Sequence, residues 1–177
     1  MQYLILLTLY AVLLFRSIKF LQLIELDEKK STIRLFIVSS CIKMIVAMLL
    51  FHFIPATGFI KDDMRYYHQG AIIAKSWKAG MPIDVGQLTG STHPAYWIYN
   101  GILFFLLGEF YLYPVTINVF LSSLAGIVFY KLVRLFFEQK IARVALMLVL
   151  FSPNIIFWTA VNSKDVLFLL MFLCIIY

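Results

Sequence analysis

The stretch KDDMRYYHQGAIIAKSWKAG, residues 61–80, lies between two hydrophobic spans and is both rich in charge and patterned. Its apolar side chains recur at the spacing of a helix, which predicts a helix that Gly80 and then Pro82 end. The spaced apolar positions are Tyr67, Ala71, Ala74 and Trp77, and the basic positions are Lys61, Arg65, Lys75 and Lys78. We interpret it as an amphipathic helix in the membrane interface, with its apolar face towards the bilayer and its basic face towards lipid headgroups. The acidic pair Asp62 and Asp63 begins the helix, where the helix dipole favours negative charge.

The composition of the whole chain is that of a membrane protein. Of the 177 residues, 63% are hydrophobic and 14% are charged, and the mean hydropathy is +0.92. A soluble domain is typically about half apolar and about a quarter charged. We therefore predict an all-α, polytopic transmembrane protein with the amphipathic helix in a long outer loop. The net charge of +6 suits anionic headgroups or a phosphate-bearing substrate, and no basic and aromatic module outside the membrane segments indicates nucleic acid.

Apolar runs set the expected spans. The long runs are at about 3–24, 33–54, 115–137 and 141–157, and the shorter runs are at 96–107 and 166–177. The last run is only about a dozen residues, whereas roughly 20 are needed to cross a bilayer. This favours the N-terminal part of a longer protein.

Basic residues predict the orientation. Five of them gather around the first loop: Arg16, Lys19, Lys29, Lys30 and Arg34. The positive-inside rule makes this loop cytoplasmic, which places the N-terminus and residues 55–92 outside. If the run 96–107 crosses fully, the basic cluster 131–143 falls outside, against the rule. If that run is short or re-entrant, the basic cluster lies inside and residues 163–165 lie outside. We favour this second arrangement because a run of about fourteen apolar residues is marginal for a crossing.

The segment Asp62-Asp63-Met64-Arg65-Tyr66 is the first candidate for chemistry. A carboxylate beside an interfacial helix can act as a general base towards a hydroxyl or amine acceptor. A guanidinium one turn on, at Arg65, matches the geometry of a phosphate oxygen. The equally weighted alternative is a solvated helix start with a surface arginine.

Further ionisable residues border the apolar runs. His93, before Pro94, can bind a phosphate or shuttle a proton, although an interfacial polar residue before a helix-starting proline is the simpler interpretation. Lys164 and Asp165 lie between two apolar runs, where ionisable groups are costly and indicate function, or else form a polar turn. Lys43 lies mid-span and is structural if it pairs with a carboxylate or snorkels. No metal-ligand spacing, phosphate-binding glycine loop or nucleophile elbow is present.

Taken in order, these motifs resemble the membrane-integral glycosyltransferases of the GT-C fold. The resemblance is closest to the protein O-mannosyltransferase and aminoarabinose transferase branch, which uses polyprenyl-phosphate-linked sugars, and it covers about residues 33–177. The matching segments are Asp62-Asp63-Met64-Arg65-Tyr66, the helix to Gly80, His93-Pro94-Ala95-Tyr96-Trp97, the basic span end 131–137, and Pro153, Trp158 and Asp165. Ala95 departs from the second proline common in the family, and residues 1–32 form an extra span with a cytoplasmic loop. The family's later spans and second large outer loop are absent from the 177 residues.

The resemblance implies roles for individual residues. Asp62 would be the acceptor-activating base, with Asp63 its close competitor, and Asp165 a second acidic residue facing the same cavity. Arg65 and His93 would contact the lipid phosphate, with Lys164 a further substrate-binding cation. Some members of the family use a divalent metal, for which this sequence shows no committed ligand set.

The expected function is transfer of a sugar from a polyprenyl-phosphate-linked donor to a lipid, glycan or protein acceptor. It would take place at the outer face of the plasma membrane, as part of cell-envelope synthesis by the longer protein. Two alternatives stay open. One is a transporter or flippase-like protein in which Lys43, His93 and Asp165 line a polar path, and the other is a non-catalytic fragment or assembly subunit.

Overall fold

The computed structural model describes residues 1–23, 29–53, 61–82 and 93–177, with the side chains of Lys61 and Asp62 outside the description. Within these ranges every regular element is a helix, as the sequence predicts. The helices are α1 (Gln2–Leu23), α2 (Lys29–Phe53), α3 (Lys61–Lys78), α5 (Pro94–Leu107), α6 (Leu112–Arg134), α7 (Gln139–Phe151), α8 (Pro153–Thr159) and α9 (Asp165–Ile176).

Three of the described helices, α1, α2 and α6, are long and apolar enough to cross a membrane. The pair α7 and α8 would make a fourth span if counted together, but it is bent by 47°. The bend divides the apolar run predicted as one span at 141–157. It lies at Ser152 and Pro153, because a proline lacks the backbone N–H that continues a helix and disfavours helical geometry in the residue before it. Helices α5 and α9 are apolar but shorter.

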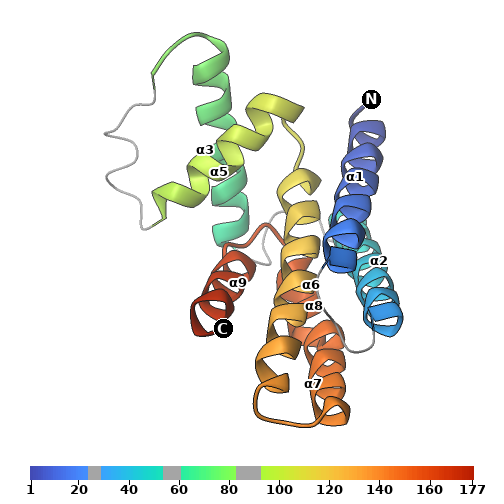
Figure 1. Ribbon diagram of the computed structural model, residues 1–177. Coiled ribbons are helices and arrows are strands. Elements are labelled where there is room, and N and C mark those ends of the chain that lie inside the picture. The colour runs from blue at the N-terminus through green and yellow to red at the C-terminus, as the bar shows by residue number, and fades with distance from the viewer. Residues whose placement is uncertain (24–28, 54–60, 83–92) are drawn as a thin grey trace.

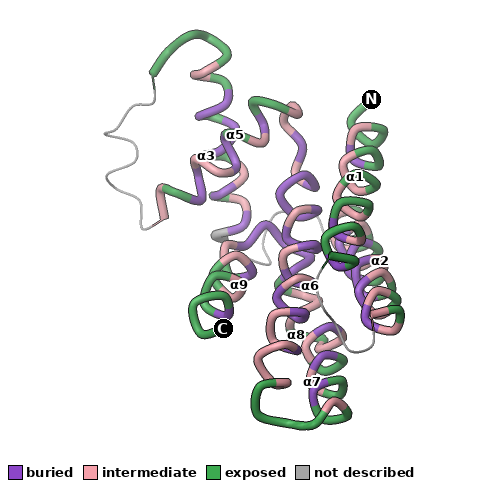
Figure 2. The backbone as a smooth tube through the Cα atoms, in the orientation of Figure 1, coloured by how far each residue is buried: buried purple, intermediate pink, exposed green. Residues whose placement is uncertain are grey.

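Helix α6 is the centre of the molecule. It packs against α1 and α2 on one side and against α9 on the other, and α7 lies beside its C-terminal half (Figure 1). Most of α6 is buried, whereas α1 exposes most of its apolar surface (Figure 2). Gly126 allows α7 to approach closely, because a Cβ there would lie 2.8 Å from Leu150 Cδ2. A helix that is apolar on all sides requires such a buried position or a lipid environment.

The ends of the helices show how the chain is threaded. Gln2 Nε2 donates a hydrogen bond to the Glu109 carbonyl oxygen over 3.0 Å, and the Phe51 ring stacks on Tyr111 with centroids 5.5 Å apart. The start of α1, the end of α2 and the start of α6 therefore meet at one end of the bundle. Near the other end, Leu21 and Phe36 belong to the same buried cluster as Tyr130 and Ala142.

Both basic clusters consequently lie at the same end of the molecule. The chain leaves α2 and enters α6 at the opposite end, so α5 does not carry it from one end to the other (Figure 1). This agrees with the arrangement in which the run 96–107 is short or re-entrant. The side of a membrane that each end faces stays a prediction.

Helix α3 crosses α5 at close range and the two make the most extensive helix pair. The crossing is close because two glycines meet it: a Cβ at Gly70 would lie 2.5 Å from Asn100 Cβ, and a Cβ at Gly101 would lie 2.6 Å from Ile73 Cγ2. The buried apolar side chains of this pair are Tyr66, Ala71, Ile73 and Ala74 on α3 and Tyr96, Trp97 and Phe104 on α5. The apolar face that we assigned to the bilayer thus packs against α5. The interfacial position of α3 stays a prediction.

The loop before α6 ties α3 to the bundle. Glu109 accepts a hydrogen bond from Tyr67 OH over 3.1 Å and forms a 3.0 Å ion pair with Lys75. Helix α6 begins at Leu112, before the apolar run predicted at 115–137, and takes Pro114 into its first turn, where a missing N–H leaves no helical bond unmade.

Candidate functional site

The break between α8 and α9 is irregular, buried and partly polar. Val161, Asn162 and Ser163 are not helical, and they expose 7%, 0% and 6% of their surface. The sequence predicts a polar break here. The structure buries it against α3, α5 and α6 instead of leaving it as a surface turn. Buried backbone and amide groups without water require protein partners, so this segment depends on what surrounds it.

Asn162 makes three hydrogen bonds to residues of two helices, α3 and α5. Its backbone N–H donates to Asp63 Oδ1 over 3.0 Å, and its Nδ2 donates to Asn100 Oδ1 over 3.0 Å. Its own Oδ1 accepts a hydrogen bond from Tyr96 OH over 3.0 Å. The backbone N–H of Asn162 therefore fixes the break against α3, and its amide side chain fixes the break against α5.

Asn118 fixes the same break to α6. Its Nδ2 donates to the carbonyl oxygens of Ser163 over 2.9 Å and Val161 over 3.3 Å. Those carbonyls have no helical partner because the chain is irregular there, and the amide satisfies them. Its Oδ1 is buried and finds no partner among the described residues, which is the kind of position an ordered water fills.

Asp63 is the carboxylate at the centre of this network. Its side chain is 9% exposed, and its Oδ2 accepts a hydrogen bond from Tyr111 OH over 2.5 Å. Burial raises the pKa of Asp63 to about 6, while the hydrogen bonds from Tyr111 and Asn162 act in the opposite direction. Desolvation is therefore the larger effect. Burial and the neighbouring Asp63 charge also raise the pKa of the Tyr111 hydroxyl, which keeps it a donor.

Two predicted substrate-binding residues, Lys164 and His93, meet at Tyr66, one turn after Asp63 on α3. Lys164 Nζ donates to Tyr66 OH over 3.0 Å and lies 5.6 Å from the centroid of its ring. The His93 ring meets Tyr66 edge-on with centroids 6.3 Å apart, and Tyr66 itself is 3% exposed. Tyr66 thus joins a residue from the start of α5 to a residue from the start of α9.

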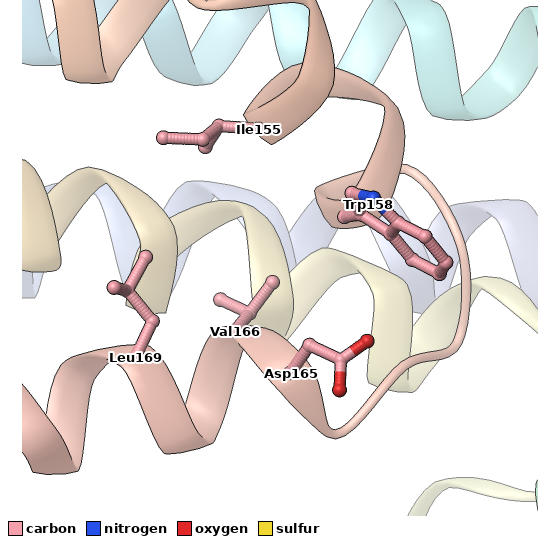
Figure 3. Close-up of a pocket in the computed structure, with 5 residues that line it drawn as sticks. All are labelled: Ile155, Trp158, Asp165, Val166 and Leu169. Atoms are coloured by element: carbon pink, nitrogen blue, oxygen red, sulfur yellow. The ribbon is translucent and has the colours of Figure 1, made fainter.

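The structure separates the remaining candidates. Arg65 is exposed on α3. Asp165 is also exposed and lies at a separate pocket of 330 Å³ between α8 and α9, lined with Ile155, Trp158, Val166 and Leu169 (Figure 3). The side chain of Asp62 lies outside the described residues, so its role as base stays a prediction.

Among the described residues Lys43 has no carboxylate partner, and it does not snorkel, so neither structural option that we considered is seen there. It is 0% exposed, and Nζ donates to Ser122 Oγ over 2.9 Å and to Ser123 Oγ over 3.4 Å. It therefore contacts α6, away from the residues around Tyr66 and from the pocket at Asp165. The structure does not group Lys43, His93 and Asp165 in one setting.

Sequence reasoning missed most of the network that holds the site. The missed residues are Asn100, Asn118, Asn162, Tyr96 and Tyr111. Three asparagines within or beside apolar runs were the available signal, because a side-chain amide in such a run needs a hydrogen-bonding partner from another helix. No described residues form a group of three or more histidine, cysteine or acidic side chains fit to hold a metal.

Comparisons with protein-family models, with curated proteins and with solved structures find no match to this chain.

Proposed function

We propose that this chain carries part of the active site of a membrane sugar transferase that uses a polyprenyl-phosphate-linked donor. The observation that carries the proposal is the convergence at Tyr66. Asp63, His93 and Lys164 were singled out from separate stretches of sequence, and they come together around the first turns of α3.

Lys164 and the His93 imidazole suit the departing lipid phosphate. When the sugar leaves, negative charge develops on the phosphate, and preorganised cations and donors stabilise it more than they stabilise the ground state. Lys164 is held by Tyr66 OH, and the His93 ring lies against the same tyrosine. Arg65, the exposed residue before Tyr66 on α3, adds a further positive charge nearby in sequence.

Asp63 acts in this proposal as a positioning residue. Both of its oxygens accept hydrogen bonds, from Tyr111 OH and from the Asn162 N–H, so the carboxylate is held within this network. The hydrogen bond from the Asn162 N–H to Asp63 fixes the position of the break. Lys164, two residues after Asn162, is thereby placed beside Tyr66. The acceptor-activating base is Asp62, and Asp165 keeps the predicted role of a second acidic residue.

A donor-cleavage assay tests the proposal. The protein is extracted from its native membrane and reconstituted in liposomes. A panel of radiolabelled polyprenyl-phosphate sugars is added as donors, with membrane extract as the acceptor. The release of polyprenyl phosphate is then measured. Asp62→Asn should lower the rate by more than about 100-fold, the usual contribution of a general base, with unchanged membrane insertion. Glu138→Gln is the matched control, because it removes a carboxylate at the other end of α6 and should leave the rate unchanged. Turnover by Asp62→Asn at the wild-type rate would remove Asp62 from the base role, and no cleavage of any donor would overturn the proposal.

One observation favours a transporter as the second candidate. A fully buried lysine inside an apolar helix is costly, and such residues often lie on ion or substrate pathways. If the protein is a transporter, Lys43→Met abolishes uptake of a labelled substrate into liposomes and leaves donor cleavage absent. If it is the transferase, Lys43→Met leaves donor cleavage intact.

A further inference from the structure

The pocket between α8 and α9 has a composition that the proposed transfer does not use. Four of its five lining side chains are apolar or aromatic, and the fifth is the Asp165 carboxylate (Figure 3). We infer that this pocket binds an organic ammonium group attached to a short apolar chain. The inference does not depend on sugar transfer, and it gives Asp165 a binding role in place of the catalytic role that the resemblance implies.

The walls suit the apolar part of such a ligand. Ile155 on α8 and Leu169 on α9 face each other across the pocket, and Val166, 4% exposed, closes the space between them (Figure 3). The volume of 330 Å³ is at the lower end of the range of about 300–1,000 Å³ in which small-molecule sites occur. That size limits the chain to a short one.

The mouth suits a cation. Trp158 and Asp165 lie next to each other at one end of the pocket, with the indole ring and the carboxylate on the same side (Figure 3). An aromatic face attracts an ammonium group through its quadrupole, and the carboxylate adds the opposite charge. This pair distinguishes an ammonium from a neutral alcohol of the same size.

The carboxylate is available to a ligand. Ser163 Oγ donates to Asp165 Oδ2 over 2.7 Å, and within the described part no residue donates to Oδ1. The neighbouring Lys164 does not neutralise it, because its Nζ is bonded to Tyr66 OH. The positive end of the α9 dipole amounts to only about half a charge, so the full negative charge of Asp165 dominates the mouth.

Two sources share this chemistry, namely the headgroup of an ammonium-bearing phospholipid and a soluble amine. A direct binding measurement with a defined probe separates them. The full protein is purified in dodecyl maltoside, which carries no charge, and titrated with hexyltrimethylammonium in a calorimeter, with protein-free micelles as the blank. Hexanol and hexanoate are the matched neutral and anionic probes.

The expected result is saturable binding of hexyltrimethylammonium, with hexanol and hexanoate at least about tenfold weaker, since they lack the cation that the aromatic and the carboxylate attract. Asp165→Asn should weaken the ammonium probe at least about tenfold and leave hexanol unchanged, because only the charge is lost. Leu169→Phe, which narrows the pocket and keeps the carboxylate, should weaken all probes, and Glu138→Gln should weaken none. Equal binding of the ammonium probe by wild type and a folded Asp165→Asn, or by wild type and Leu169→Phe, would overturn the inference.

A competition step identifies the source. Displacement of the probe by dihexanoyl phosphatidylethanolamine or dihexanoyl phosphatidylcholine, and not by hexylamine, indicates a lipid headgroup. Displacement by hexylamine, which carries both an ammonium group and a short apolar chain, indicates a soluble amine. If neither class displaces the probe, the pocket does not recognise an ammonium ligand of either kind and the inference fails.

Discussion

At the residue scale, Asp63 shows how burial and hydrogen bonding compete at one carboxylate. The side chain lies within the protein and is held by Tyr111 and Asn162, both of which favour its ionised form. Its pKa is nevertheless raised to about 6, because the loss of water around the charge outweighs two hydrogen bonds. The protonated form is therefore favoured by folding.

This raised pKa predicts a pH dependence of stability that Asp63→Asn removes. The folded protein binds the proton more tightly than the unfolded chain, so the stabilisation is complete below pH 3.8 and is lost as the pH rises through about 6. A shift of about two units corresponds to at most about 3 kcal/mol of unfolding free energy. Chemical unfolding of the detergent-purified protein from pH 4 to pH 7 should show wild type losing stability relative to Asp63→Asn. Parallel curves for the two proteins would contradict it.

The burial of Lys43 leads us to expect that two substitutions change the stability of the protein to different extents. Replacing the buried lysine by methionine removes a desolvated charge and keeps the volume, which is often neutral or stabilising. Ser122→Ala removes the oxygen that accepts its shorter hydrogen bond and leaves the ammonium under-satisfied, which should cost about 1–3 kcal/mol. Thermal unfolding of both variants measures the difference. If Lys43→Met is the more destabilised of the two, the lysine has a counter-ion beyond the residues described.

At the scale of elements, the crossing of α3 and α5 determines where the candidate site forms. The two helices meet at Gly70 and Gly101, and this contact brings Tyr66 on α3 beside Tyr96 on α5, with ring centroids 4.8 Å apart. The break after α8 then inserts Asn162 between them. The site is thus built by one close helix pair and one buried irregular segment.

Gly70→Ala should separate this pair. The added Cβ would lie 2.5 Å from Asn100 Cβ, a distance that requires the backbones to move. Overpacking of this kind typically costs about 1–3 kcal/mol. Ile72→Ala on the exposed side of the same helix is the control and should have little effect. Thermal unfolding that ranks Ile72→Ala as the more destabilised variant would contradict the close crossing.

The sequence predicted where the helices lie better than it predicted which helices pack against one another. Apolar runs and the helical spacing at 61–80 placed the helices, with most ends within a few residues, because periodicity depends on local sequence. Periodicity shows which face of α3 is apolar, but it does not distinguish lipid from another helix as the covering, and the structure places α5 there. The partners of Asn162 come from positions 63, 96 and 100, and only the fold brings such distant residues together.

At the scale of the whole molecule, the basic residues and the Asp63 network lie towards opposite ends of the helical bundle. The basic residues of the first loop and of the α6–α7 junction share one end, while the Asp63 network lies towards the opposite end, close to the start of α6. This polarity is typical of a membrane protein whose basic end faces the cytoplasm.

Labelling with a membrane-impermeant maleimide tests that polarity. In a background with both native cysteines replaced by serine, Lys30→Cys and Phe136→Cys should react from the same side of sealed vesicles, because both are exposed at the basic end. Ala79→Cys, exposed after α3, should react from the other side. Labelling of Lys30→Cys and Phe136→Cys from opposite sides would require α5 to cross the membrane and would contradict this threading.

The most direct test of the proposed site is donor cleavage by Lys164→Met in liposomes, compared with wild type and Glu138→Gln. Lys164 contacts Tyr66 through its ammonium group, and methionine keeps the length of the lysine side chain without its charge. The account predicts that polyprenyl phosphate release falls by about 100-fold or more, the loss seen when one preorganised charge-stabilising group is removed, while Glu138→Gln is unaffected. Release at the wild-type rate by a folded Lys164→Met would contradict it.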